Sequence, residues 1–201
     1  MGLDTMSVRP VSDSDQDSNF EKQLRCTGEK GKPRILTAEK IADIEKYGKT
    51  VLGSREFEAA MKQKHHYKST VGQHSLDVAF IALAIGLFFA KLHVRISIRA
   101  IVIGCLCHDL GILDRSHFAS GPDMCRMHPI ESAAISREFS NNDATVFDMC
   151  EHHMFPLMSK PPKTTEGWIV SIADKVSSVG EVVLPPVRKK WERRNAEVMS
   201  A

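Results

Sequence analysis

The amino-acid sequence predicts an all-α fold. Three observations lead to that prediction: apolar residues recur at helical spacing from about residue 37 to about residue 180, no stretch alternates with period two for long, and no Asn-Gly or Asp-Gly hairpin signal is present. The chain has 201 residues, of which 42% are hydrophobic and 26% charged. Such a composition is typical of a soluble globular protein with one main domain.

Two short helices are expected before residue 65. Thr37 can cap the first, whose apolar residues fall on one face, and Ser54 can cap the second. Residues 1–34 are rich in Ser, Asp, Gly and Lys and contain too few apolar residues to form a packed element. We therefore expect a disordered lead at 1–34, followed by a domain that spans 35–184.

A long apolar helix is expected from Ser69 or Thr70 to about Leu92. Apolar residues cover nearly its whole circumference, which predicts a position in the middle of the fold. Its longest apolar stretch, Val78 to Ala90, has 13 residues, whereas a bilayer span needs about 20. The sequence therefore predicts a buried helix and no membrane span.

Four further helices are expected after residue 94. They cover about 95–108, 129–139, 142–152 and 166–180, and Pro129 suits the first turn of the helix that it opens. Residues 185–201 begin with two prolines and continue as a basic tail. We interpret that tail as a solvated, frayed helix, with a phosphate or membrane contact as the alternative.

Charge and cysteine content narrow the classes of function. The chain carries 27 basic and 25 acidic side chains, a net charge of +2, so it lacks the basic excess with which proteins bind long nucleic acids. Its five cysteines form an odd set without a repeated CxxC motif, and its first residues are polar. This pattern favours a reducing, cytoplasmic location.

The histidines carry the functional signal. The chain has nine, and its candidate metal ligands form five sites, two of them adjacent pairs, that lie between 20 and 34 residues apart, about one helix plus its connection. Each ligand could therefore arrive on a different helix and converge at one end of a bundle. Imidazole and carboxylate together suit a divalent transition metal such as Fe, Mn, Co, Ni or Zn. The candidates are His74, His108, Asp109, His128, His152, His153 and Asp174.

The two aspartates have distinct reasons to bind a metal. Adjacent residues on a helix point about 100° apart, so the pair His108-Asp109 can serve two ions, with the aspartate bridging. Asp174 stands in the apolar run WIVSIAD, where a buried carboxylate is costly without a partner. A metal ion would supply that partner.

Five motifs hold these ligands in order: VGQHSLDVA, CHDLGILD, HPIESA, EHH and IADKVSS. Together they resemble the HD-domain superfamily of metal-dependent phosphohydrolases, in the variant with extra histidines between the HD pair and the final aspartate. The resemblance runs from about Tyr67 to Val183. The stretch from His153 to Lys175 is also similar to a bacterial subgroup that shares HMFPL, PP, EGW and DK in this order.

This resemblance implies an α-helical HD-domain bundle with a metal centre at the helix ends. Carried over residue by residue, two metal ions share Asp109: the first is held by His74, His108, Asp109 and Asp174, the second by Asp109, His128, His152 and His153. Thr70 stands where three-metal members carry a glutamate, which favours two ions. Ile112 replaces a lysine of the cyclic di-GMP phosphodiesterases, and the chain also lacks their DGxGYP-type loop, which argues against that substrate.

The predicted function is hydrolysis of a phosphoester in a nucleotide or another small phosphorylated metabolite by a metal-activated water, with His108 and Asp109 as catalytic residues. Two alternatives stay open: a mixed-valence di-iron oxygenase of the HD type, and a non-catalytic metal-binding HD module. Candidates for binding the phosphate are Arg115, Lys163, Lys175 and His66. His65, next to His66, could also reach the substrate from the loop before the long helix.

Overall fold

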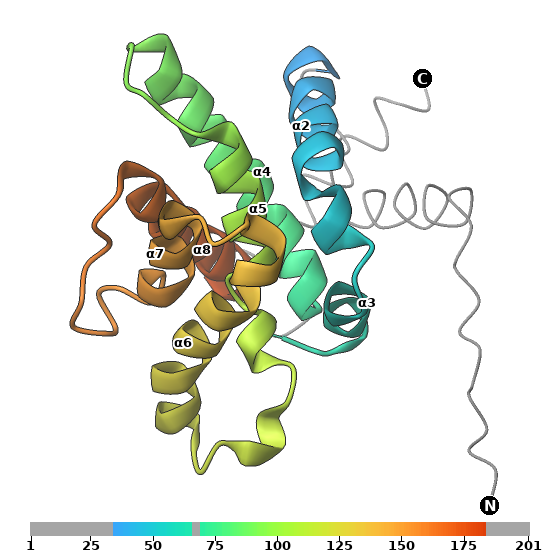
Figure 1. Ribbon diagram of the computed structural model, residues 1–201, viewed down its shortest axis with the longest axis vertical. Helices are drawn as coiled ribbons and strands as arrows, with labels where there is room; N and C mark the ends of the chain where they lie inside the picture. The colour runs from blue at the N-terminus through green and yellow to red at the C-terminus, as the bar shows by residue number, and fades with distance from the viewer. Residues whose placement is uncertain (1–33, 66–68, 184–201) are drawn as a thin grey trace, which may run out of the picture.

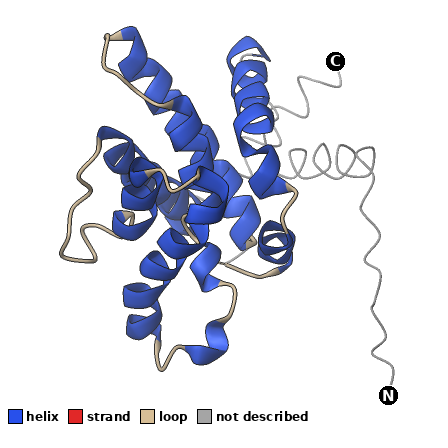
Figure 2. Ribbon diagram, in the orientation of Figure 1, coloured by secondary structure: helices blue, strands red, loops and turns tan. Residues whose placement is uncertain are grey.

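The computed structural model of the chain describes residues 34–65 and 69–183 (Figure 1). Within these ranges the backbone forms seven helices and two short 3₁₀ turns, with no strand (Figure 2), which confirms the all-α prediction. The helices are α2 (Arg34–Leu52), α3 (Arg55–Lys62), α4 (Val71–Lys91), α5 (Ile98–Cys107), α6 (Gly121–Ser140), α7 (Ala144–His152) and α8 (Thr165–Val183). The 3₁₀ turns are η1 (Leu110–Ile112) and η2 (Arg115–His117).

Helices α4 and α5 form the middle of the bundle. In Figure 1, α2 and α3 lie on one side of them, α7 and α8 on the other, and α6 extends below. Most residues of α4 before Gly86 are buried, as the apolar pattern predicted, and every residue of α5 from Ala100 to Cys107 is buried. Asp109 and its histidine neighbour follow directly after α5, so the core of the bundle holds the HD pair in place.

The start of α4 is set by a capping box. The side chain of Thr70 accepts a hydrogen bond from the Gln73 amide, and the Gln73 side chain accepts one from the Thr70 amide. Both bonds satisfy amides that the helix itself leaves unpaired. Because this cap fixes where the helix begins, it also fixes His74 on the first turn of α4.

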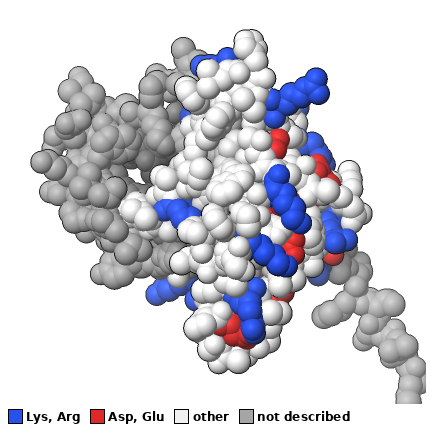
Figure 3. Space-filling view, turned by 90° about the vertical axis from the view of Figure 1, so that its left-hand side faces the viewer, with Lys and Arg blue, Asp and Glu red and all other residues white. Residues whose placement is uncertain are grey.

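By length and mean hydropathy, α4 is the one helix in the described part of the chain that could cross a membrane, and half of its most apolar window is buried inside the bundle. The face of the protein in Figure 3 shows basic and acidic residues interspersed, with uncharged surface between them. That face therefore presents no continuous basic surface.

Helix α6 corrects the sequence-based prediction most. The sequence placed Pro129 in a first turn, but α6 begins at Gly121, eight residues earlier, and Pro129 lies inside the helix. Ser120 caps the true start, where its side chain accepts from the Asp123 amide, and Pro122 occupies the first turn. A proline is tolerated there because the first turn needs no amide donor. Pro122 and Pro129 both fit this rule, so the rule alone does not identify the start of the helix. The longer helix places His128 in its interior.

The other helix boundaries differ by smaller amounts. Helix α2 begins at Arg34, so Thr37 is not its cap. Ser54 does cap α3, as predicted, through a bond from the Phe57 amide. Helix α5 begins at Ile98 after a Ser97 cap, three residues later than expected. The expected ends of α4, α5, α6 and α7 lie within one residue of those observed, whereas the starts of α2, α5 and α6 differ by three to eight residues.

Gly111 lets η1 approach α6 closely. A Cβ at this position would meet the His128 carbonyl oxygen and would lie 2.8 Å from the Ser132 amide nitrogen. The Gly111 amide itself donates to the Ser132 hydroxyl at 2.9 Å. Only a glycine fits this contact, which brings the turn after Asp109 against the turn that carries His128.

The variant Gly111→Ala should be less stable than wild type by about 1–3 kcal/mol, because the added methyl group forces two backbones apart. Urea unfolding followed by circular dichroism measures the change. Gly180→Ala is the matched control: a Cβ there meets no described atom within 4 Å, and alanine should stabilise α8 by up to about 1 kcal/mol. Wild-type stability in Gly111→Ala would contradict the close contact.

Candidate metal centre

Six of the predicted ligands converge at one end of the bundle. They come from five helices or helix ends, and all are buried, with at most 8% of any residue exposed. His74 comes from α4, His108 and Asp109 from the end of α5, His128 from α6, His153 from the end of α7 and Asp174 from α8. The convergence expected from the ligand spacing is therefore present.

Asp109 lies at the centre of this group, and its two oxygens face different histidines. Oδ2 lies 3.4 Å from Nε2 of His108 and 3.8 Å from Nε2 of His74. Oδ1 lies 3.4 Å from Nε2 of both His128 and His153. One carboxylate thus joins two sets of imidazoles.

The separations around Asp109 are those of neighbouring ligands on one ion. With metal–ligand distances of about 2.1 Å, adjacent ligand atoms lie about 3.0 Å apart in an octahedron and about 3.4 Å apart in a tetrahedron. Good N–H···O hydrogen bonds are shorter, at about 2.7–3.2 Å. The separations of 3.4 Å from Asp109 to His108, His128 and His153 therefore fit coordination better than direct pairing.

The backbone fixes which ring nitrogen each histidine turns toward Asp109. His108, His128 and His153 each have Nδ1 at 2.7–2.8 Å from a carbonyl oxygen in the preceding turn of chain. A carbonyl can only accept, so Nδ1 donates its proton to it. In the neutral ring, Nε2 is then left with the lone pair that a metal requires.

This tautomer leaves the centre short of donors. Nε2 of His128 and Nε2 of His153 lie 3.1 Å apart, so two lone pairs would face each other if both rings were neutral. Burial lowers the pKa of His128, but the hydrogen bond and charge of Asp109 outweigh burial and raise that pKa. Nε2 of His108 is fully buried and has no hydrogen-bond partner among the described residues, a state that costs about 1–3 kcal/mol. A cation between these atoms removes both penalties, and we conclude that the donor set fits a divalent metal ion.

Asp174 completes the group from α8. Its Oδ1 lies 3.0 Å from Nε2 of His74 and 3.9 Å from that of His108. Its Oδ2 accepts from the Lys175 ammonium group at 3.0 Å, and the same ammonium donates to the His153 carbonyl. The apolar run around this aspartate is therefore compatible with its charge, because cationic and imidazole groups meet it inside the bundle.

Protonation states at neutral pH suit metal binding. Burial would raise the pKa of Asp109, but His108, His128 and His153 outweigh it and hold that pKa well below its ordinary value. The pKa of Asp174 is likewise raised by burial and lowered more strongly by the hydrogen bond with His74 and by nearby charges. Burial lowers the pKa of His108 to about 4. Both carboxylates are thus ionised and His108 is neutral, as metal ligands must be.

His152 contacts other carboxylates, whereas its neighbour His153 faces Asp109. Its side chain is buried, with Nδ1 3.0 Å from Asp148 Oδ1 and Nε2 3.6 Å from Glu151 Oε2. A carboxylate on the distal ring nitrogen is a common support for a metal-binding histidine. Its assignment to the second ion stays a prediction.

The predicted phosphate-binding residues are not grouped. The Arg115 guanidinium is exposed and donates to the Lys64 carbonyl, and the side chain of Lys163 points to solvent. Lys175 is already engaged by the centre. His66 lies outside the described residues. The role of these four in substrate binding stays a prediction.

His65 is close to the centre, although the spacing argument did not include it among the ligands. Its Nε2 lies 3.4 Å from Asp109 Oδ2, and its ring centroid is 4.6 Å from that of His74. Only 8% of its side chain is exposed. It stands in a loop, where no helical period predicts direction, so the sequence could raise it only as a residue within reach of substrate.

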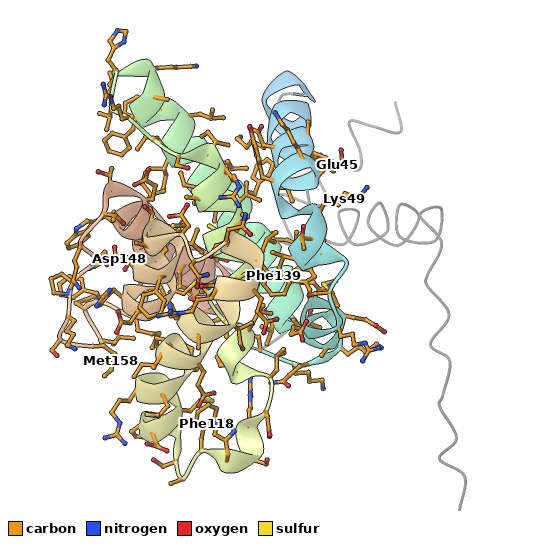
Figure 4. The ribbon with its side chains drawn as sticks, in the orientation of Figure 1. Glu45, Lys49, Phe118, Phe139, Asp148 and Met158 are labelled. Carbon is orange, nitrogen blue, oxygen red and sulfur yellow. The ribbon has the colours of Figure 1, made fainter. Side chains whose placement is uncertain are left out.

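Asp148, labelled in Figure 4, ties α7 to the start of α8. It accepts from the backbone amides of Lys163 and Thr164 at 3.0 Å and from the Thr164 hydroxyl at 2.7 Å. The same carboxylate faces Nδ1 of His152. It therefore holds both ends of the loop that follows His153. No pattern in the sequence marked this residue, because its partners lie 15 or 16 positions away.

Comparison with known proteins gives one result. A family model described as HD domain matches residues 71–178, a segment that begins with α4 and ends within α8. No curated protein and no solved structure matches the chain.

Loss of Asp148 should loosen this loop. Asp148→Ala leaves two amides unpaired, and we expect a loss of about 2–4 kcal/mol in the free energy of unfolding together with faster cleavage between residues 154 and 162 in limited proteolysis. Asp114→Ala, at an exposed aspartate, is the control. If both variants are cleaved at the wild-type rate, Asp148 does not hold the loop.

The metal-free protein should lose stability in acid through His108. Its pKa is about 4 in the folded state and about 6.5 when unfolded. The folded state therefore binds fewer protons between these values, and the free energy of unfolding falls as the pH drops from about 6.5 to about 4. Urea unfolding of chelator-treated protein measures this loss. Between pH 7 and pH 4.5 the free energy of unfolding should fall by about 2–3 kcal/mol more in wild type than in His108→Asn. Equal losses in the two proteins would contradict a role for His108 in acid destabilisation.

Proposed function

The chain belongs to the HD domain family, and from that premise we propose that it is a phosphohydrolase with a binuclear metal centre, acting on a nucleotide or another small phosphorylated metabolite. Enzymes of this family are generally metal-dependent phosphohydrolases. One observation carries the binuclear assignment: Asp109 turns one oxygen to each of two imidazole sets.

The donors divide into two groups around Asp109. On the Oδ2 side lie His74 and His108, with Asp174 next to both. On the Oδ1 side lie His128 and His153. Nitrogen and oxygen donors in these numbers suit Fe, Mn, Co, Ni or Zn. Each group lacks a full octahedral set from the chain, which leaves room for water and substrate.

Two divalent ions held by these residues would lower the pKa of a bound water from about 15.7 toward 7 and would stabilise negative charge on the phosphoryl group. The residues of the chain provide the rest. Asp109 and Asp174 stay ionised, and the carbonyl contacts of His108, His128 and His153 hold their Nε2 atoms in one direction. Burial keeps bulk water away from these groups, which strengthens every charge interaction among them.

Charge supports an anionic substrate. The two aspartates contribute −2 to the centre, and two divalent ions would contribute about +4. The centre would then be locally positive, although the whole chain has a net charge of only +2. A small phosphate ester carries the complementary charge.

Asp109→Ala should lose both metal ions, because the shared carboxylate is removed from both sets of ligands. Turnover should fall at least about 100-fold. Protein purified without oxygen, analysed for metal content and assayed with Mn or Fe on a panel of phosphoesters, measures both effects. Asp114→Ala, an exposed aspartate near the same turn, should retain both metal and activity.

Two outcomes would overturn this assignment. Turnover that requires dioxygen would replace the hydrolase with an oxygenase. An Asp109→Ala variant that still binds two equivalents of metal would exclude Asp109 as the shared ligand.

A further inference from the structure

His65 lies beside the candidate metal centre, although it lies outside the segment that matches the family. It precedes that segment by six residues, in the connection between α3 and α4. Ligand atoms of His65, His74 and Asp109 all lie within 4.8 Å of one another. The 3.4 Å from its Nε2 to Asp109 Oδ2 equals the distance from Nε2 of His108 to the same oxygen. His65 is therefore as close to this oxygen as His108, a predicted metal ligand.

Local backbone pairing holds His65 and Lys64 against the residues that precede α4. Its amide donates to the Ser69 carbonyl at 3.0 Å. Lys64 and Thr70 form an antiparallel bridge next to that bond. The connection is therefore closed at its base, and Thr70 is also the cap of α4. Both His65 and His74 are positioned from the same few residues.

Two further bonds tie the connection to the HD turn. The side-chain amide of Gln63 donates to the Ile112 carbonyl at 2.8 Å, and the Arg115 guanidinium donates to the Lys64 carbonyl at 3.0 Å. Both partners lie within six residues of Asp109 along the chain. These two bonds hold the backbone before His65 against the segment that carries Asp109.

We propose that His65 is an additional metal ligand, which binds through Nε2 the ion on the Oδ2 side of Asp109. This inference rests on the metal centre of the proposed function, but not on the hydrolytic reaction. That ion would then be held by His65 together with His74 and Asp109, whose ligand atoms all lie within 4.8 Å of one another.

Cobalt titration tests this assignment with a readout other than activity. The full chain is stripped with a chelator, and Co²⁺ is added in competition with a chromophoric chelator while the visible absorption of Co²⁺ is recorded. Wild type should bind two equivalents. His65→Ala should bind one of them about 10–100-fold more weakly and change the visible spectrum, and added imidazole should restore both. His117→Ala, at an exposed histidine paired with Glu131, is the matched control and should behave as wild type.

Each outcome decides the proposal. Unchanged affinity and spectrum in His65→Ala would overturn it. If that variant fails to fold, as shown by circular dichroism, His65→Gln keeps the side-chain volume without the imidazole and must show the same weakened site. Wild-type protein that binds no cobalt would overturn the metal centre and the His65 assignment together. Cobalt bound through His65 without phosphoester turnover would overturn only the proposed hydrolysis.

Discussion

The carboxylate of Asp109 faces imidazole nitrogens from α4, α6, the ends of α5 and α7, and the connection before α4. An ionised carboxylate buried this deeply costs several kcal/mol unless other charges compensate it. No single helix could supply that compensation. The helix ends must therefore converge on Asp109. The packing of the bundle, the caps and the connections position them there.

Small local features allow the helix ends to converge on Asp109. The missing side chain of Gly111 lets the HD turn touch α6, and the cap at Thr70 sets the first turn of α4. Carbonyl groups in the preceding turns then orient the rings, so that Nε2 and not Nδ1 points inward. Such preorganisation matters because a site that is ordered before the ion arrives loses little entropy on binding.

Local signals accounted for much of the fold. The cap at Ser54, the start of α4 at Ser69 or Thr70, and the buried course of α4 followed from residue types and apolar spacing. These features depend on neighbours within one or two turns. The start of α6 did not, since Pro122 and Pro129 both satisfy the rule for a first turn. In the structure the Ser120 cap, which accepts from the Asp123 amide, lies just before Pro122 and marks it as the proline of the first turn.

The sequence by itself determined which residues could hold a metal: the ordered histidines and two aspartates, one helix apart, identify the donor types and the family. Tertiary structure decided how they are used. It divided the imidazoles between the two oxygens of Asp109, turned His152 toward Asp148, and brought His65 in from a loop. The physical reason is the sequence separation of the interacting residues. Donor type and helical periodicity depend on residues a few positions apart, whereas the direction of a ring depends on contacts between segments far apart in the chain.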